Sequence, residues 1–97
     1  MHVFNGADFN DVWKKLLPAD QEVLKLLAQG VTELHSEPAR MRLGSALGLD
    51  KPVNKNTPQH SLRRLQEENL VVKLDYGDYQ IQDDAFAEWL RSLELDT

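Results

Sequence analysis

The 97-residue sequence contains no cysteine, which excludes disulfide bonds and thiolate metal sites. No apolar run approaches the roughly 18 residues that a membrane-spanning helix needs. The first residues also lack the charged start and apolar middle of a signal peptide, so we expect a cytoplasmic protein without a membrane partner. Stability must then come from packing, and a chain of this size buries roughly 60 to 70% of its unfolded surface.

Catalytic and cofactor motifs are missing as well. The histidines His2, His35 and His60 are scattered, with no pair four residues apart that could hold a metal. The five glycines form neither a GxxxxGK(S/T) nor a GxGxxG phosphate loop, and no serine lies in a GxSxG setting. We therefore expect no enzyme activity, no cofactor and no metal site in this chain.

The composition is that of a globular protein with an uneven distribution of charge. Hydrophobic residues make up 41% of the chain and charged residues 28%, and the net charge is −5. Residues 38–64, however, carry six cations and one anion, a balance of +5, so the remainder carries −10. This division predicts a basic patch on an acidic body, and the local field decides what a surface attracts.

Apolar periodicity predicts two helices in the first third of the chain. Residues 1–7 show no pattern and are expected to be a flexible lead-in to a single domain, 8–94, with a tail at 95–97. Asp8 can cap a first helix, and Pro18 starts a second one that Gly30 ends. A short edge strand is expected over residues 31–34. The expected inward-facing residues are Phe9, Val12, Trp13, Leu16 and Leu17 in the first helix, and Val23, Leu24, Leu27 and Ala28 in the second.

Ser36 and Pro38 predict the start of a third helix, which ends at Gly48. Gly44 is small enough to let a neighbouring helix approach closely, as two crossing helices in a helix-turn-helix require. Residues 49–56 form a longer connection than the three or four residues of a simple helix-turn-helix, so this connection must loop out. The expected inner face of the third helix consists of Ala39, Leu43, Ala46 and Leu47.

Residues 54–81 are typical of a helix followed by a hairpin, and the rest of the chain is organised around them. Thr57 is the expected cap, with Pro58 at the first helical position. Leu62 and Leu65 fall on one side, and His60, Arg63 and Arg64 project from the other. Asn69 is expected to end the helix in a left-handed conformation, before strands near 70–72 and 79–82 joined by a turn at 76–78.

Asp83 or Asp84 then caps a last helix, whose apolar face is formed by Ala85, Phe86, Trp89, Leu90 and Leu93. The expected fold is therefore mostly α with a small β-hairpin. More specifically, it is a winged helix-turn-helix with an extra N-terminal helix and a C-terminal helix.

Three segments resemble one family. The run WKKLLPADQEVLKLLAQG from Trp13 to Gly30 is similar to the entry of the C-terminal winged-helix domain of archaeal-type ATPases of the AAA+ and STAND group. LRRL at 62–65 with NLV at 69–71 resembles the exit of its recognition helix, and YQIQDDAFAEWLR at 79–91 resembles its closing segment. Leu17 replaces a usual serine and Asp84 a usual proline. The ATPase core is absent, so the resemblance implies no ATP hydrolysis here.

The first functional hypothesis is binding of double-stranded DNA, with the helix from Thr57 in the major groove. Glu67, Glu68, Asp75 and Asp78 oppose it, because they would repel phosphates. The residues expected near base edges are Asn56, Gln59, His60 and Arg63, and those expected at phosphates are Arg40, Arg42, Lys51, Lys55 and Arg64.

The second hypothesis is a protein-interaction module that docks on an ATPase domain or another partner, or self-associates. It rests on the acidic body and on the aromatic residues Phe9, Trp13 and Trp89. If these residues pack internally, little apolar surface remains for a partner; if the first helix detaches, an apolar groove is left. The sequence leaves the oligomeric state open.

Overall fold

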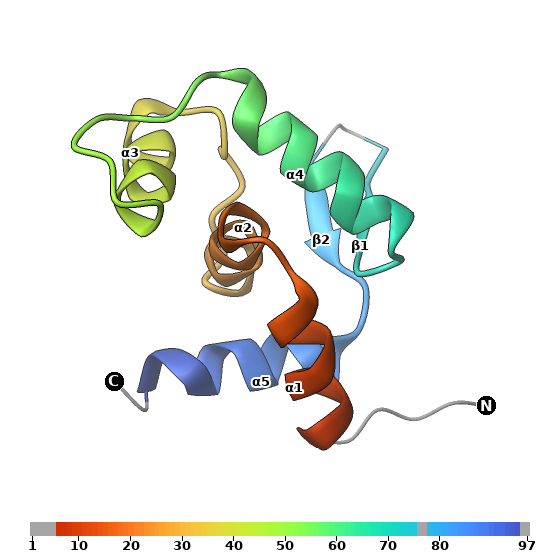
Figure 1. The fold of residues 1–97 in the computed structure, drawn as a ribbon. Helices are drawn as coiled ribbons and strands as arrows, with labels where there is room; N and C mark the ends of the chain where they lie inside the picture. The colour runs from red at the N-terminus through yellow and green to blue at the C-terminus, as the bar shows by residue number, and fades with distance from the viewer. Residues whose placement is uncertain (1–5, 76–77, 96–97) are drawn as a thin grey trace.

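The computed structural model describes residues 6–75 and 78–95. Within these residues it contains five α-helices and one antiparallel sheet of two strands (Figure 1). The prediction of a mostly helical fold with a small β-hairpin is confirmed. In chain order the elements are α1 (Gly6–Lys15), α2 (Pro18–Ala28), α3 (Glu37–Ala46), α4 (Asn56–Glu67), β1 (Val71–Lys73), β2 (Tyr79–Ile81) and α5 (Asp84–Leu95).

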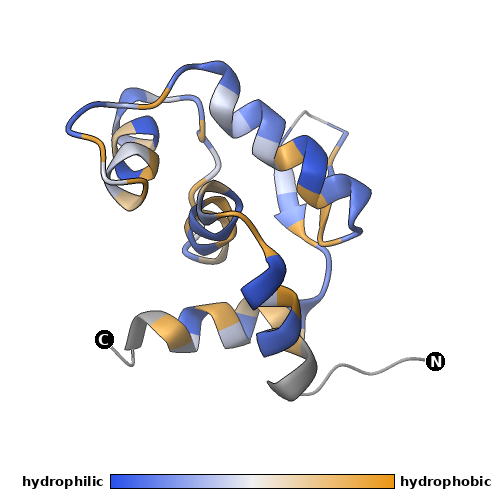
Figure 2. Cartoon of the chain, viewed as in Figure 1, coloured by the Kyte–Doolittle hydropathy of each residue, from blue (hydrophilic) through white to orange (hydrophobic). Residues whose placement is uncertain are grey.

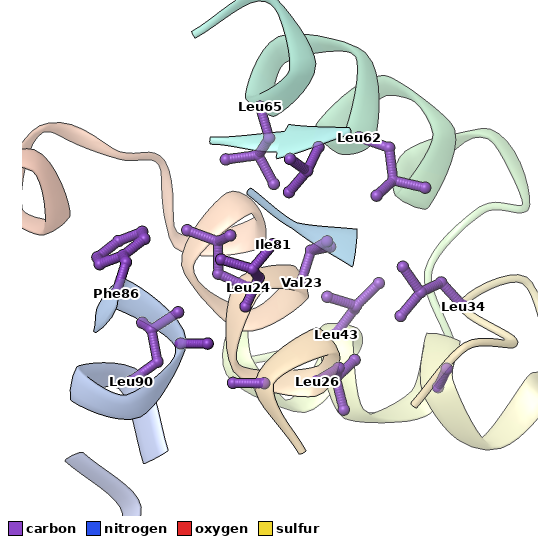
Figure 3. Close-up of a cluster of buried hydrophobic side chains, with 14 of the residues drawn as sticks. Val23, Leu24, Leu26, Leu34, Leu43, Leu62, Leu65, Ile81, Phe86 and Leu90 are labelled. Carbon is purple, nitrogen blue, oxygen red and sulfur yellow. The ribbon is translucent and has the colours of Figure 1, made fainter. Parts of the chain in front are cut away.

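Helix α2 lies at the centre of the molecule, where it packs against α3, α4, α5 and β2 (Figure 1). Its residues Val23, Leu24 and Leu26 are fully buried. Each such side chain stabilises the fold by about 1.5–3 kcal/mol relative to exposure. The positions of α3 and α4 therefore depend on α2. The side chains that surround it in the core include Leu34, Leu43, Leu62, Leu65, Ile81, Phe86 and Leu90 (Figure 3).

Helices α2, α3 and α4 end in the same way. Each is followed by a residue with positive φ: Gly30 at 91°, Gly48 at 81° and Asn69 at 62°. The predicted left-handed conformation of Asn69 is confirmed. In this Schellman arrangement the next N–H donates back to a carbonyl five residues earlier, which stops the helix and redirects the chain. These bonds run from Val31 to Leu26 (3.0 Å), from Leu49 to Gly44 (2.8 Å) and from Leu70 to Leu65 (2.9 Å).

The hairpin follows α4 directly. Val71 pairs with Ile81 and Lys73 with Tyr79. In β2, Tyr79 is half-buried, Gln80 exposed and Ile81 buried, so the alternation predicted for this strand is confirmed. Strand β1 does not alternate: Val71 is buried, Val72 half-buried and Lys73 exposed. Of the predicted turn at 76–78, residues 76 and 77 lie outside the described residues.

The first and last helices have different bounds from those predicted. Helix α1 begins at Gly6 and therefore includes two residues of the expected lead-in. It ends at Lys15, and Leu17, which was expected to face the core, is 53% exposed. The reason is that the chain leaves the helix before Leu17 so that α2 can start at Pro18. Helix α5 runs to Leu95, one residue into the expected tail.

The edge strand predicted over residues 31–34 is wrong. The described residues form no strand there, because the Ser36 N–H donates to the Glu33 carbonyl at 3.2 Å and turns the chain into α3. Leu34 is buried by this turn without needing a strand partner.

The close approach predicted at Gly44 is real, but its partner is a loop and not a helix. A Cβ on Gly44 would overlap the backbone carbonyl oxygen of Lys51 and lie 3.2 Å from the carbonyl carbon. Ala46 and Leu47 were expected to face inward, yet both are exposed. The loop, rather than a helix, covers this side of α3, and it does not extend over them.

Candidate nucleic-acid interface

The start of α4 lies two residues before the predicted one. The helix begins at Asn56, and Lys55 stands at the N-cap position in place of Thr57, without a side-chain cap. Asn54, one residue earlier, supplies the acceptors for the first turn. The Asn54 Oδ1 atom accepts the Asn56 N–H at 2.8 Å, and the Asn54 carbonyl accepts the Thr57 N–H at 3.0 Å. The first turn of α4 contains no acidic residue. The partial positive charge at this helix end is therefore not neutralised within the turn.

The outer face of α4 carries one polar stripe. Asn56, His60 and Arg63 are exposed and are spaced by four and three residues, which places them on one side of the helix. They span about 10.5 Å, roughly the height of three base pairs. Figure 2 shows that α4 is mostly hydrophilic. By helical spacing, its buried residues Leu62 and Leu65 lie on the side opposite the polar stripe. Within the described residues, none of the three polar side chains forms an ion pair or hydrogen bond.

Two lysines lie on the loop before α4. Lys51 and Lys55 are exposed, and neither pairs with an acid among the described residues. With Leu47 and Leu49, which are also exposed, they line a shallow hollow beside the helix start. The loop is held in place by α3.

Arg40 fixes this loop to α3. Its Nη1 atom donates to the Val53 carbonyl at 3.2 Å, and the Val53 N–H donates to the Arg40 carbonyl at 3.0 Å. The Nε atom of Arg40 donates to the His35 carbonyl at 3.1 Å. This residue was expected to contact phosphates, but the structure uses it to position the loop that carries the lysines.

Arg42 is also held within the molecule. Its Nη2 atom lies 3.6 Å from Oε2 of Glu22, which is largely buried in α2, and its Nη1 atom donates to Gln29 at 3.0 Å. Arg42 therefore connects α3 to α2. Sequence reasoning missed Glu22 as its partner, although an acid in the first turns of a central helix was a usable signal.

Arg64 was expected to project from the outer face of α4, and this prediction is wrong. Its Nη2 and Nε atoms donate to Asp20 Oδ1 and Oδ2 of α2, at 2.8 and 3.0 Å, and Nη2 also lies 3.3 Å from Ser61 Oγ. Asp20 is only 3% exposed, so its carboxylate requires a partner. The hydrogen bond to Asp20 raises the pKa of Arg64, and burial partly opposes this effect. Arg64 therefore connects α4 to α2.

The hairpin adds one cation that sequence reasoning did not single out. Lys73 is exposed and borders a hollow that His35 and Gln59 also line. The Gln59 Nε2 atom lies 3.5 Å from the Tyr79 hydroxyl, so this predicted base-contacting residue is turned toward the hairpin. The charge of Lys73 was the signal that could have identified it as exposed, because alternation alone would place it on the same face as the buried Val71.

The far end of α4 has the opposite charge. Glu67 and Glu68 are exposed at its C-terminus, and Asp75 is exposed at the hairpin. These carboxylates would repel phosphates. A nucleic-acid surface on this molecule is therefore limited to the first two turns of α4 and the loop before it.

The aromatic residues that were expected to bind a partner pack α1 onto α5. The Phe9 ring centroid lies 5.2 Å from that of Phe86 and 6.0 Å from that of Trp89, and the Trp13 and Trp89 rings meet edge to face at 6.0 Å. Phe9 is buried, and both tryptophans are half-buried. With α1 in this position, Phe9 does not reach the surface.

Over the described residues, no cluster of three or more histidine, aspartate or glutamate side chains could hold a metal ion. In the same residues, every helix is too short or too polar to cross a bilayer. Comparisons of the chain with protein-family models, with curated proteins and with solved structures found no match.

Proposed function

We propose that this chain is a winged helix-turn-helix module that binds double-stranded DNA through α4 and the preceding loop and catalyses no reaction. The observation that carries the proposal is a group of three exposed cations that form no ion pair among the described residues: Lys51 and Lys55 in the loop before α4, and Arg63 in its second turn. The order of three helices followed by a short hairpin supports it.

In this proposal the first two turns of α4 enter the major groove. Arg63 is suited to a guanine edge and Asn56 to an adenine edge, with His60 between them on the same stripe. Lys51 and Lys55 contact phosphates on one side of the groove. On random DNA, which does not offer Arg63 its preferred base, Arg63 also pairs with a phosphate. The same proposal includes a relation to the C-terminal winged-helix domain of archaeal-type ATPases, which the sequence segments given above support. A cytoplasmic location is proposed with it.

Arg40, Arg42 and Arg64 make contacts within the molecule, so fewer cations are left to contribute electrostatically to DNA binding. With three free cations at phosphates, log K should fall with log salt at a slope of about −2.7, where five such contacts would give about −4.5. Binding of random DNA should then be weak, with a dissociation constant on the order of 10⁻⁴ to 10⁻⁶ M.

Fluorescence polarisation with a labelled random 20-base-pair duplex, from about 25 to 200 mM salt, tests this proposal. The Lys51→Ala, Lys55→Ala double variant should lower the slope to about −0.9. Lys14→Ala, Lys15→Ala is the matched control, because these lysines are exposed on α1 and removing them changes the net charge equally. Equal losses in the two variants, or no binding by wild type at about 50 mM salt, would refute the proposal.

A protein-docking function is the second candidate, and one observation favours it. Met41, Leu47 and Leu49 are exposed large apolar side chains within nine residues of each other on α3 and the loop after it. Leu47 and Leu49 also line one hollow, and exposed apolar side chains that lie together are typical of an interaction surface. Light scattering on wild type and on a Leu47→Ser, Leu49→Ser variant distinguishes the two candidates, because only a docking surface would lose self-association or partner binding while DNA affinity is retained.

A further inference from the structure

A pocket lies at the acidic end of α4, away from the proposed DNA surface. It is formed by α1, the turn between α4 and β1, and the start of α5, and its volume is about 160 Å³. An apolar cavity of about 150 Å³ can take a benzene ring, so one aromatic or large aliphatic side chain fits here. Apolar side chains line most of it, and two carboxylates lie at its edge; the lining residues are Phe9, Val12, Glu68, Asn69, Leu70, Asp83 and Phe86.

This pocket exists because α1 is attached to the rest of the molecule mainly along one side. The aromatic cluster fixes α1 to α5, and no comparable packing joins α1 to the end of α4 among the described residues. Val12 and Leu70 consequently remain half-buried on facing walls. An apolar side chain that entered the pocket would remove these walls from water, which is favourable.

The charge around the pocket selects the kind of occupant. Glu68 is exposed and Asp83 half-buried, and neither forms an ion pair with the described residues. Glu67 and Asp84 add negative charge beside them. Lys15 shares a neighbouring hollow with both glutamates, but it pairs with neither in the described structure. The field at the edge of the pocket therefore attracts cations and repels nucleic acid.

We propose that this pocket docks a segment of a partner polypeptide that places one aromatic or large aliphatic side chain between two basic residues. The apolar floor takes the central side chain, and Glu68 and Asp83 pair with the two cations. Because Lys51 and Lys55 lie before the N-terminal end of α4 and Arg63 does not line the pocket, the partner and DNA do not compete for the same residues.

The test uses an acetylated and amidated peptide, Gly-Arg-Phe-Arg-Gly, and follows the tryptophan emission of the protein. Trp89 reports on the pocket because its ring lies 6.0 Å from that of Phe9. Replacing the phenylalanine of the peptide with alanine should weaken binding by about 10-fold or more, since its burial is lost. Glu68→Gln in the protein should weaken binding about 2- to 5-fold.

Glu67→Gln is the matched control: it removes the same charge at the adjacent position but does not line the pocket. Val12→Phe should fill the pocket and abolish binding. If that variant fails to fold, Asp83→Asn serves instead, because asparagine can still cap α5 as the Asp83 carboxylate caps Ala85 at 2.8 Å.

Four outcomes overturn the proposal. The first is that Glu67→Gln weakens binding as much as Glu68→Gln, and the second is that the alanine peptide binds equally well. The third is that 2-phenylethylamine binds as tightly as the peptide, which would indicate a site for small amines. The fourth is that wild type sediments as a dimer and Val12→Phe as a monomer, which would make a second copy the occupant.

Discussion

Replacing Arg64 with alanine should destabilise the fold, whereas replacing the adjacent Arg63 should not. Arg64 makes two charge-assisted hydrogen bonds, at 2.8 and 3.0 Å, to the carboxylate of Asp20, which is 3% exposed. Removing one partner of a buried ion pair costs about 3–5 kcal/mol. The Arg64 side chain is 43% exposed, so water screens part of the attraction, and we expect a loss of about 2 kcal/mol.

Thermal and urea unfolding measure this difference. For a domain of this size, a loss of about 2 kcal/mol lowers Tm by about 8–16 °C. Arg63 is exposed and makes no ion pair with the described residues, so Arg63→Ala should change the unfolding free energy by less than about 0.5 kcal/mol. A double-variant cycle with Asp20→Ala isolates the contribution of the pair.

DNA titrations of the same two variants should show the reverse order. Arg63→Ala should lower the salt slope by about 0.9, and Arg64→Ala should leave it unchanged at temperatures where the variant is folded. A stable Arg64→Ala protein whose salt slope falls by about one would refute the assignment of Arg64 as a connection between α4 and α2.

Two further predictions concern backbone positions. Gly44→Ala should destabilise the protein by about 2 kcal/mol, because overlap with the Lys51 carbonyl costs about 3 kcal/mol and the gain in helix propensity returns about 1. Urea unfolding of this variant and of Ser45→Ala, at the exposed neighbouring position, checks the prediction. Equal changes in unfolding free energy for the two variants would contradict it. Asn69→Ala should be about 1 kcal/mol less stable than Asn69→Gly, because φ at this position is 62° and alanine tolerates it poorly. Identical denaturation midpoints for the two Asn69 variants would show that the turn does not depend on this conformation.

Most of the fold could be predicted because its signals are local. Helix periodicity identified the buried faces around Leu24 and Leu62, and Asn69 was recognised as a left-handed residue after a helix. The edge strand at 31–34 could not be judged from propensity, because whether a short apolar segment pairs or turns depends on which surface buries Leu34. The inward orientation predicted for Leu47 failed for a similar reason: a loop covers the Gly44 side of α3 and leaves Leu47 exposed.

The candidate site was predicted less well than the fold. The sequence shows which residues carry charge, but not which of them are already paired. In the sequence, Arg42 and Arg64 look the same as arginines that contact DNA. Only the position of α2 shows that they are paired with Glu22 and Asp20. Lys51, Lys55 and Arg63 remain as predicted on the outside because no acid of the described residues comes within reach. Long-range ion pairs are a tertiary property, so a count of cations overestimates the free positive charge.

The contacts of the loop before α4 have a consequence for binding. A connection of this length would ordinarily be expected to sample many conformations, and a ligand would have to restrict it at an entropic cost. Here Gly44 receives the Lys51 carbonyl and Arg40 exchanges hydrogen bonds with Val53, so the backbone that carries the two lysines is already ordered. The loop is long yet preorganised, so a partner that binds these lysines loses little affinity to the entropic cost of ordering the loop backbone.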